Sequence, residues 1–324
     1  MRLLSLSIRL TVFAICVGWL ATKIEVDATL KQFETFSFWA ALAAAALVIP
    51  SMIGYSWRLR YLLRNSATLG DASRATLIGI VFNNFLPIRG GELVKAIFLS
   101  RMAPIGFEKA LVAVFWERFA DLNAALIMIL IIGVAFDLPV MLTTMGGVIF
   151  TIWVLIFAVK KYPDVVLRLL GLVPSKKLQN SGLALLSGLT DEVSVRRQIV
   201  INAQTIAIWF LLMLQCVVVL RNAAHLPLTA FECATVFAIA TVFIMIPSAP
   251  ANVGLMEAGV VIGASLFGIP HDQALAAAIL LHIVQLAPAS LVGLIWLIFH
   301  SDTTRLLLDE YHRRKDMRSR GNNI

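Results

Sequence analysis

The sequence predicts an all-α polytopic membrane protein with six full spans and two broken or re-entrant helical hairpins that form an inverted repeat. Hydrophobic residues make up 60% of the chain and charged residues only 14%, and the mean hydropathy is +0.87. Runs of about 20 apolar residues, enough to cross the hydrocarbon core of a bilayer, recur along its length. The composition excludes a soluble domain of this size, and we expect one transmembrane domain over residues 1–324.

Six segments are apolar and long enough to be expected as full crossings. The N-terminal one resembles a signal peptide, but Trp19 and Leu20 stand where cleavage before residue 22 would require small residues, so we expect an uncleaved span. The expected spans are about Ile8–Ala21, Phe36–Tyr55, Ala110–Phe136, Leu138–Val159, Ile199–Leu220 and Gln273–Phe299.

Two further segments, Ala75–Arg101 and Leu228–Gly268, each contain an apolar run, a break with proline and a second apolar run. Pro87 and Pro247 have no backbone N–H, so each is expected to end the first helix of its pair. We expect each segment to enter the membrane and return to its side of entry. Two full crossings by each segment would satisfy the same pattern.

The basic residues support this topology, because cytoplasmic loops carry an excess of lysine and arginine. Every basic cluster falls on one side only if both hairpins return to their side of entry or cross twice. We therefore expect both termini in the cytoplasm, at the cell inner or plasma membrane. The clusters are Arg2 and Arg9, then Arg58, Arg60, Arg64 and Arg74, then Arg101 and Lys109, and then the segments 160–197 and 300–324.

The segment 160–197 mixes apolar and basic residues, which predicts an amphipathic cytoplasmic segment lying on the inner leaflet, and residues 300–324 form a basic cytoplasmic tail. The net charge of +8 lies mainly beside apolar segments, which favours acidic lipid headgroups over nucleic acid. Cys16, Cys216 and Cys233 lie inside apolar runs and are interpreted as packing residues.

The two hairpins and the spans that follow them resemble each other over about residues 75–136 and 228–299. Three crossings separate the hairpins. Because three is an odd number, the hairpins are expected to enter from opposite faces, as in the inverted repeats of secondary transporters. Chance similarity between apolar segments is the alternative, because the identity is weak. The corresponding positions are Pro87 and Pro247, Glu92 and Glu257, and Arg118 and His282.

The stretch "NNFLPIRGGELVKAIFLSR", residues 83–101, places polar groups between apolar runs. A helix that restarts near Gly91 directs free amides and its dipole into the membrane, which predicts an anion site strengthened by Arg89 and Lys95. A similar restart is expected near Asn252 to Gly254. The alternative is an intrahelical pair of Glu92 and Lys95, with Arg89 reaching the interface.

The stretch "VFWERFADL" is a second polar constellation, in which Glu117 and Asp121 share one helical face. One hypothesis pairs either carboxylate with Arg89 or Lys95 until a phosphate arrives. The alternative is an Arg118–Asp121 pair with Glu117 reaching cytoplasmic water. Pairing across helices is expected in both cases, because a lone charge in a membrane is costly.

Glu257 and His282 are isolated ionisable residues in apolar surroundings. Opposite each other they could form a proton relay, whereas a single histidine on an apolar face is more often a packing residue. Asn84 is either a substrate contact or an interhelical hydrogen-bond partner. No metal-binding or nucleophile motif accompanies these residues, so we expect neither a cofactor nor an enzyme.

At "NNFLPIRGGELVKAIFLSR", "ERFADL" and "IPSAPANVGLMEAG" the chain resembles the lysylphosphatidylglycerol synthase transmembrane-domain family, also called flippase-like membrane proteins, over about Phe36 to Phe299. The resemblance implies movement of a lipid between leaflets. The chain departs from the family in "SAPAN", where a glycine-rich turn is usual, and in His282, where many members have arginine. The matching motif residues are Asn84, Pro87, Arg89, Gly91, Glu92, Glu117, Arg118, Asp121, Gly254 and Glu257.

We therefore expect a lipid translocase with a midplane phosphate site for an anionic phospholipid or a polyprenyl-phosphate lipid. The alternatives are transport of a hopanoid or other lipid without a phosphate head, a membrane-embedded lipid-modifying enzyme, or an accessory subunit of a lipid or glycan pathway. A homo-oligomer or a lipid-synthesis partner is compatible with each, and no soluble transferase domain is expected after Phe299. The candidate substrate-binding residues are Asn84, Arg89, Gly91, Glu92, Lys95, Glu117, Arg118, Asp121, Glu257 and His282.

Overall fold

A computed structural model of the chain describes residues 26–85, 90–136, 139–162, 194–245 and 250–300, together with Gly18 and isolated residues between 163 and 193. These residues fold into helices joined by short connections, and the described part of the chain contains no strand. The all-α prediction is therefore confirmed. The predicted span Ile8–Ala21, most of the segment 160–197 and the tail after His300 lie outside the described residues.

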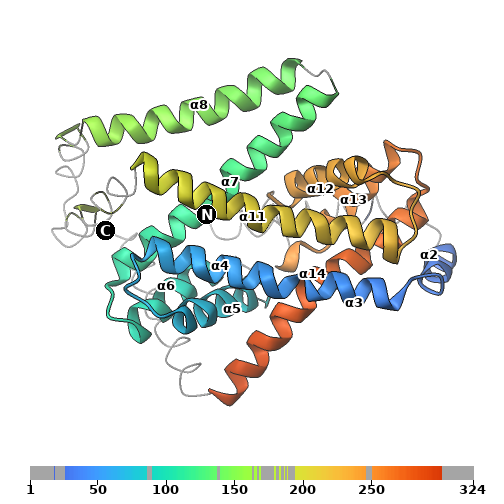
Figure 1. The fold of residues 1–324 in the computed structure, drawn as a ribbon, viewed down its shortest axis with the longest axis horizontal. Helices are drawn as coiled ribbons and strands as arrows, with labels where there is room; N and C mark the ends of the chain where they lie inside the picture. Colours follow the sequence, from blue (N-terminus) through green and yellow to red (C-terminus); the bar gives the residue numbers. More distant parts are fainter. Residues whose placement is uncertain are drawn as a thin grey trace. The chain divides into compact units, whose positions relative to one another are not determined.

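Figure 1 shows the helices along the chain, and by their internal contacts the residues form two compact units. Unit 1 comprises Met1–Ile53, Leu77–Gly91 and Ile208–Phe299, and unit 2 comprises Gly54–Thr76, Glu92–Ala207 and His300–Ile324. The helices are α2 (Val26–Phe33), α3 (Phe38–Ala46), α4 (Val48–Leu62), α5 (Leu69–Phe85), α6 (Gly91–Met102), α7 (Phe107–Ala135), α8 (Pro139–Lys161), α11 (Val195–Val217), the π-helix η1 (Val218–Ala223), α12 (Ala230–Met245), the 3-10 turn η2 (Pro250–Asn252), α13 (Leu255–Ser265) and α14 (His271–Phe299).

Within the part of the chain that the structure describes, four helical stretches are long and apolar enough to cross a membrane: Phe38–Leu62, Phe107–Ala135, Val195–Ala223 and His271–Phe299. Each covers one of the predicted spans, so the chain is a multi-pass membrane protein. The 23-residue α8 occupies the position of a fifth predicted span.

The predicted span at Phe36–Tyr55 differs from the structure in two respects. It is divided at Leu47, because Pro50 cannot donate a hydrogen bond to the Ala46 carbonyl one turn earlier. It also continues as α4 to Leu62, seven residues beyond the predicted end. The last two turns of α4 therefore carry arginines that were predicted to lie in a loop.

Each predicted hairpin contains one helix before its break and one after it: α5 and α6 in the first hairpin, α12 and α13 in the second. Pro87 and Pro247 lie in the breaks but outside the described residues. The side from which each hairpin enters the membrane stays a prediction.

The first helices of the two hairpins begin in the same way. Thr68 accepts a hydrogen bond from the Asp71 amide at 3.1 Å, and the Asp71 carboxylate accepts one from the Thr68 amide at 3.3 Å. Thr229 and Glu232 form the same reciprocal pair at the start of α12, at 3.2 and 2.6 Å. This capping box explains why α5 begins six residues before the predicted Ala75.

Unit 1 is held together by close packing of α12 on α13 and of α13 on α14. A Cβ atom on Gly259 of α13 would lie 2.7 Å from the Ala240 Cα of α12, and one on Gly263 would lie 3.1 Å from the Val236 Cα. The two glycines are four residues apart and share a helical face, so they allow the two backbones to approach closely.

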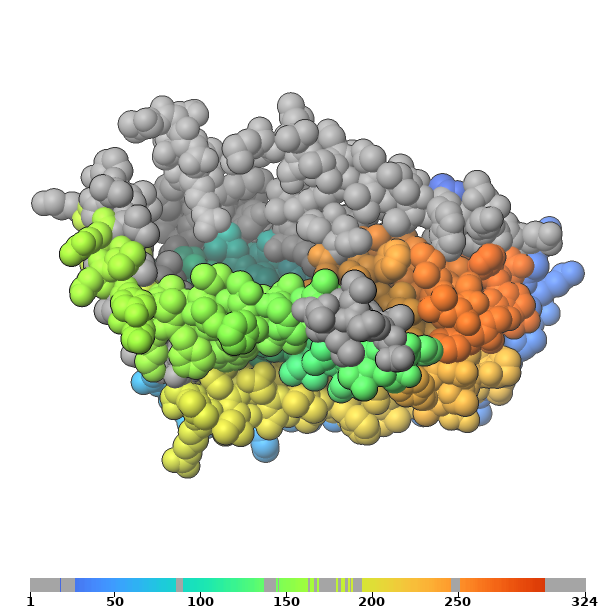
Figure 2. Space-filling view, turned by 90° about the horizontal axis from the view of Figure 1, so that it is seen from above, coloured from blue at the N-terminus to red at the C-terminus, as the bar shows by residue number. Residues whose placement is uncertain are grey.

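In unit 2, α7 packs against α8 through aromatic side chains. The rings of Phe119 and Trp153 meet edge to face at 5.2 Å, and the Trp153 indole N–H donates to the Asn123 side-chain oxygen at 3.2 Å. On the face seen in Figure 2, α8 lies at the surface, where Phe150 and Leu155 are exposed. Such an apolar surface is suited to lipid.

The α12–α13 packing predicts a difference between two glycine-to-alanine substitutions. Gly259→Ala should lower the free energy of unfolding by about 1–2 kcal/mol, because the new methyl group meets backbone atoms of α12. Gly146→Ala in α8 is the matched control: no atom lies within 4 Å of its Cβ position, so it should be neutral or stabilising. Thermal unfolding in one detergent checks this, and equal stability of the two variants would contradict it.

Candidate functional site

Six charged side chains from α4, α6 and α7 gather in unit 2, and we call them the charge cluster. The three cations and three anions are connected by ion pairs within 4 Å. The cluster consists of Arg58, Glu92, Lys95, Glu117, Arg118 and Asp121.

Arg58 lies at the centre of the charge cluster, and its side chain is fully buried. One guanidinium nitrogen donates to Asp121 Oδ1 at 2.7 Å and to the Thr205 hydroxyl at 2.9 Å, and the other donates to Asp121 Oδ2 at 3.3 Å. Glu117 Oε1 lies 3.9 Å from the second nitrogen. The paired contact with Asp121 is the geometry in which a guanidinium binds a carboxylate most strongly.

Lys95 and Glu117 form a second buried pair. The Lys95 Nζ donates to Glu117 Oε2 at 2.6 Å, and the two side chains are 4% and 0% exposed. Glu117 therefore does not reach water, in contrast to one of the two alternatives drawn from the sequence.

Arg118 is the most exposed member of the charge cluster, with 52% of its side chain accessible. Its Nε lies 3.3 Å from Glu92 Oε1, and its NH1 group lies 3.4 Å from Asp121 Oδ2. These contacts are longer than the shortest contacts of Arg58 and Lys95, which measure 2.7 Å and 2.6 Å. The cluster thus has tight, buried pairs at one end and looser pairs around an accessible guanidinium at the other.

Among the buried polar atoms of the charge cluster, Arg58 Nε and Glu117 Oε1 make no hydrogen bond to the described residues. A buried polar group without a partner is costly, so such atoms usually bind water or a ligand. The cluster therefore has capacity for a further polar group.

Unit 1 holds a second polar site at the start of α13. His282 Nδ1 of α14 lies 2.6 Å from Glu257 Oε1, and its Nε2 lies 2.9 Å from the Ala251 carbonyl oxygen. The other carboxylate oxygen of Glu257 accepts the Gly254 amide at 2.7 Å. Both side chains are about one-tenth exposed.

The two sites contain an equivalent contact. The sequence comparison aligned Glu92 with Glu257 and Arg118 with His282, and in each unit the carboxylate meets its cationic or basic partner: Glu92 with Arg118 in unit 2, and Glu257 with His282 in unit 1. The internal repeat itself stays a prediction.

The amides that were expected to be free at the helix restarts already have acceptors. Gly91 donates to the Asn83 side-chain oxygen at 2.9 Å, and Gly254 donates to Glu257. A Cβ on Gly91 would collide with the Gly79 carbonyl oxygen, so only glycine allows α5 and the start of α6 to approach this closely. Asn84 donates to the Ser290 hydroxyl at 2.9 Å. It therefore makes an interhelical hydrogen bond, which is one of the two roles predicted for it.

The sequence analysis missed Arg58 and grouped it with cytoplasmic loop residues, which the structure corrects. Arg58 is buried because α4 continues past Tyr55, whose ring faces the guanidinium at 5.2 Å. The signal in the sequence is that Arg58 lies three residues after Tyr55 and four before Leu62, on the apolar side of the helix, whereas Arg60 is exposed. Arg89 lies outside the described residues.

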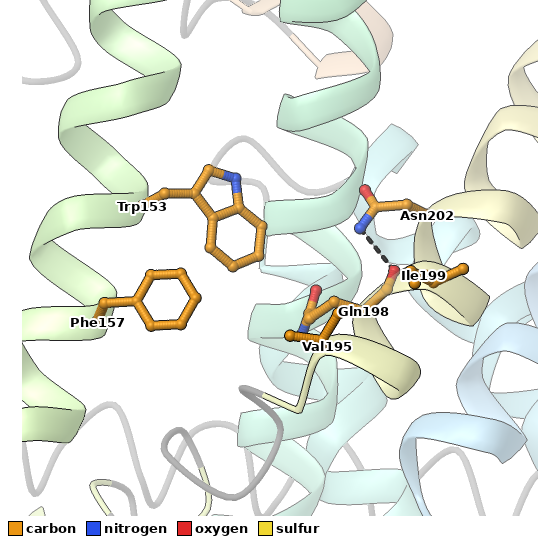
Figure 3. A pocket seen from close by; sticks show the side chains of 6 residues that line it. All are labelled: Trp153, Phe157, Val195, Gln198, Ile199 and Asn202. Carbon is orange, nitrogen blue, oxygen red and sulfur yellow. Dashed lines mark hydrogen bonds between the residues drawn. The ribbon is translucent and has the colours of Figure 1, made fainter.

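A separate pocket of about 240 Å³ lies in unit 2, between α8 and the first turns of α11 (Figure 3). Trp153 and Phe157 face Gln198 and Asn202 across it. The Asn202 side-chain amide donates to the Gln198 backbone carbonyl at 2.7 Å. Its lining contains no charged side chain and none of the predicted site residues.

Among the residues that the structure describes, no group of three or more His, Cys, Asp or Glu side chains is placed to hold a metal ion. Cys216 and Cys233 are buried, and both are free thiols.

Comparison with known protein families identifies one match over most of the chain. The family model described as "Lysylphosphatidylglycerol synthase TM region" matches residues 6–293. A search of curated proteins found no match.

The burial of Arg58 predicts a large difference between two neighbouring arginines. Arg58→Ala should lower the free energy of unfolding by about 3–5 kcal/mol, because it leaves Asp121 and Glu117 buried without their shared cation. Arg60→Ala is the matched control on the same helix, and its exposed side chain should contribute less than about 1 kcal/mol. Denaturant titration of both variants in detergent measures this, and similar losses would contradict the assigned role of Arg58.

Proposed function

Because the chain belongs to the lysylphosphatidylglycerol synthase TM region family, we propose that it moves a lipid with an anionic head group between the leaflets of the membrane. The charge cluster in unit 2 is the proposed binding site for that head group. The protein has several helices long enough to span a membrane, and two of them, Phe38–Leu62 and Phe107–Ala135, carry members of the cluster.

The observation that carries this proposal is the concentration of three cations in apolar helices, each held by a carboxylate. Charged side chains inside spanning helices are rare and mark substrate pathways more often than structural contacts. A structural role would be met by complete pairing, whereas Arg118 is half exposed and its contacts, at 3.3 and 3.4 Å, are longer than the 2.6 and 2.7 Å contacts of Lys95 and Arg58.

Exchange of anions at Arg118 is the proposed mechanism. A lipid phosphate presents two oxygens to a guanidinium, as a carboxylate does, so it can replace Glu92 or Asp121 without leaving Arg118 unpaired. The fully buried Lys95–Glu117 pair would remain in place and hold α6 against α7. The pairs that are exchanged are therefore the accessible ones.

The chemistry of Arg118 favours an anion over a neutral lipid. Its accessible guanidinium keeps its charge and pairs with anions, so a phosphate headgroup can bind it, whereas a hopanoid or another lipid without a phosphate offers it no partner. Arg89 adds a further cation to the stretch of residues 83–101. An anionic phospholipid or a polyprenyl-phosphate lipid is therefore the proposed cargo.

The distribution of basic residues sets the proposed orientation. The clusters before and after the spanning helices favour an orientation with both termini in the cytoplasm and the protein in the inner or plasma membrane. In this orientation the N-terminal part of α7, which carries Glu117 and Arg118, is nearer the inner leaflet.

The proposed function predicts selective loss of transport in two variants. In proteoliposomes, exchange of labelled phosphatidylglycerol between leaflets should fall at least about tenfold in Arg118→Gln and in Arg89→Ala, because each removes a charge-assisted contact to the headgroup. Exchange is measured as the loss of label signal when a quencher that acts on the outer leaflet is added.

Arg101→Gln is the matched control, because Arg101 is an exposed arginine in the last turn of α6 outside the charge cluster. It should exchange phosphatidylglycerol at the wild-type rate. Equal exchange of phosphatidylglycerol and phosphatidylcholine, unaffected by Arg118→Gln or Arg89→Ala in folded protein, would contradict the proposal. Recovery of chemically altered lipid would favour the lipid-modifying alternative.

A further inference from the structure

The contacts of His282 require a definite number of protons. The Ala251 carbonyl oxygen can only accept a hydrogen bond, so the facing Nε2 carries a hydrogen. The opposite contact, Nδ1 to Glu257 Oε1 at 2.6 Å, needs one further hydrogen between the two atoms. That hydrogen belongs either to an imidazolium facing a carboxylate or to a neutral imidazole facing a carboxylic acid, and in both cases the pair has taken up one proton.

Loss of this proton must break one of the two contacts. A neutral imidazole has a single N–H, and both Ala251 and an ionised Glu257 are acceptors. If the hydrogen stays on Nε2, a nitrogen lone pair faces the Glu257 carboxylate. If it moves to Nδ1, a lone pair faces the Ala251 carbonyl. The deprotonated pair cannot keep the geometry seen here.

These contacts hold the segment that leads from the break into α13. Ala251 and Asn252 have φ values of 56° and 60°, and Gly254 has a φ of 86°, so three of four successive residues adopt the left-handed conformation. Non-glycine residues persist there only when their surroundings determine them. His282 fixes the Ala251 carbonyl and Glu257 fixes the Gly254 amide, so the pair supplies these determinants.

We propose that His282 and Glu257 form a proton-binding site, and that uptake and release of its proton switch the conformation of residues 251–254. The ligand is a hydrogen ion, and the site lies within unit 1. This inference goes beyond lipid movement and does not depend on the identity of a cargo. It gives the second hairpin a means of responding to a proton gradient.

The other ionisable groups on the elements packed around the pair, in the described part of the chain, make no polar contact with His282 or Glu257. In the described part of the chain, the polar contacts of His282 and Glu257 go to each other, Ala251 and Gly254. α3 and the unit 1 part of α5 carry no ionisable side chain. The ionisable side chains of the elements packed on α13 and α14 are Asp27 and Lys31 in α2, Arg221 in η1, Glu232 and Cys233 in α12, and His271 and Asp272 in the first turn of α14.

Nitrogen-15 NMR of histidine-labelled protein tests the proton count directly. The chain has five histidines, and His282→Gln identifies the His282 signals by their loss. At low pH we expect Nε2 to carry hydrogen and Nδ1 to be protonated or to accept a strong hydrogen bond, with a change at both nitrogens between about pH 5 and about pH 9. A bare Nε2 at every pH, or no change across this range, would overturn the proposal.

Glu257→Gln separates proton binding from a structural role. A glutamine amide can donate to Nδ1 and accept from Gly254, so it reproduces the protonated pair but cannot lose a proton. In wild-type protein, hydrogen-exchange protection of residues 251–258, corrected for intrinsic exchange, should fall about five- to tenfold as the pair deprotonates, the loss expected for one hydrogen bond.

The same protection should be independent of pH in Glu257→Gln. His271→Gln is the matched control, because it removes a histidine from the first turn of the same helix and should keep the wild-type pH response. A wild-type pH response in Glu257→Gln would overturn the proposal. These measurements contain no transport step, so a cargo other than an anionic lipid would leave their outcome unchanged.

Discussion

The cost of leaving a charge unpaired in an apolar interior is the constraint on which unit 2 depends. Arg58 has no exposed side-chain surface, so protein groups must neutralise it; Asp121 of α7 supplies the opposite charge, and the Thr205 hydroxyl of α11 accepts a further hydrogen bond. Apolar side chains can pack in several rotational settings, whereas a paired guanidinium–carboxylate contact is directional. The ion pair therefore determines which faces of α4, α7 and α11 meet within the unit, and the tight Lys95–Glu117 contact does the same for α6 and α7.

The same constraint makes the charge cluster responsive to a ligand on the proposed mechanism. A cation in such surroundings cannot be left bare, but it can exchange one anion for another at little net cost in electrostatic energy. Exposure within the cluster decides where exchange takes place: the side chains of Arg58 and Glu117 are inaccessible, whereas those of Arg118 and Glu92 are 52% and 25% exposed. Rigid pairs and exchangeable pairs thus occupy opposite ends of one network, so a headgroup can bind without disrupting the helix packing.

The two halves of the chain use a common plan with different chemistry. Each has a helix that begins at a threonine capping box, a break, a restarted helix with a carboxylate in its first turn, and a basic partner on the next long helix. In the first half the partner is a guanidinium, which keeps its charge at all physiological pH values. In the second it is an imidazole, which can lose a proton. A permanent cation is suited to anion binding, and a titratable pair is suited to proton binding, so the two proposed sites differ in the ligand that they take.

The sequence by itself determined the all-α membrane class, four spans confirmed as long apolar helices, and the two interrupted segments, because apolar run length and helix-breaking residues are local properties of the chain. It also determined which charged residues lie inside apolar segments, but not their partners. Arg58 was assigned to a loop because arginines at the end of an apolar run are typical of cytoplasmic flanks, and only the continuation of α4 to Leu62 turns it inward. Tertiary structure alone decided that Lys95 meets Glu117 and His282 meets Glu257, because pairing depends on how distant helices rotate and pack against one another.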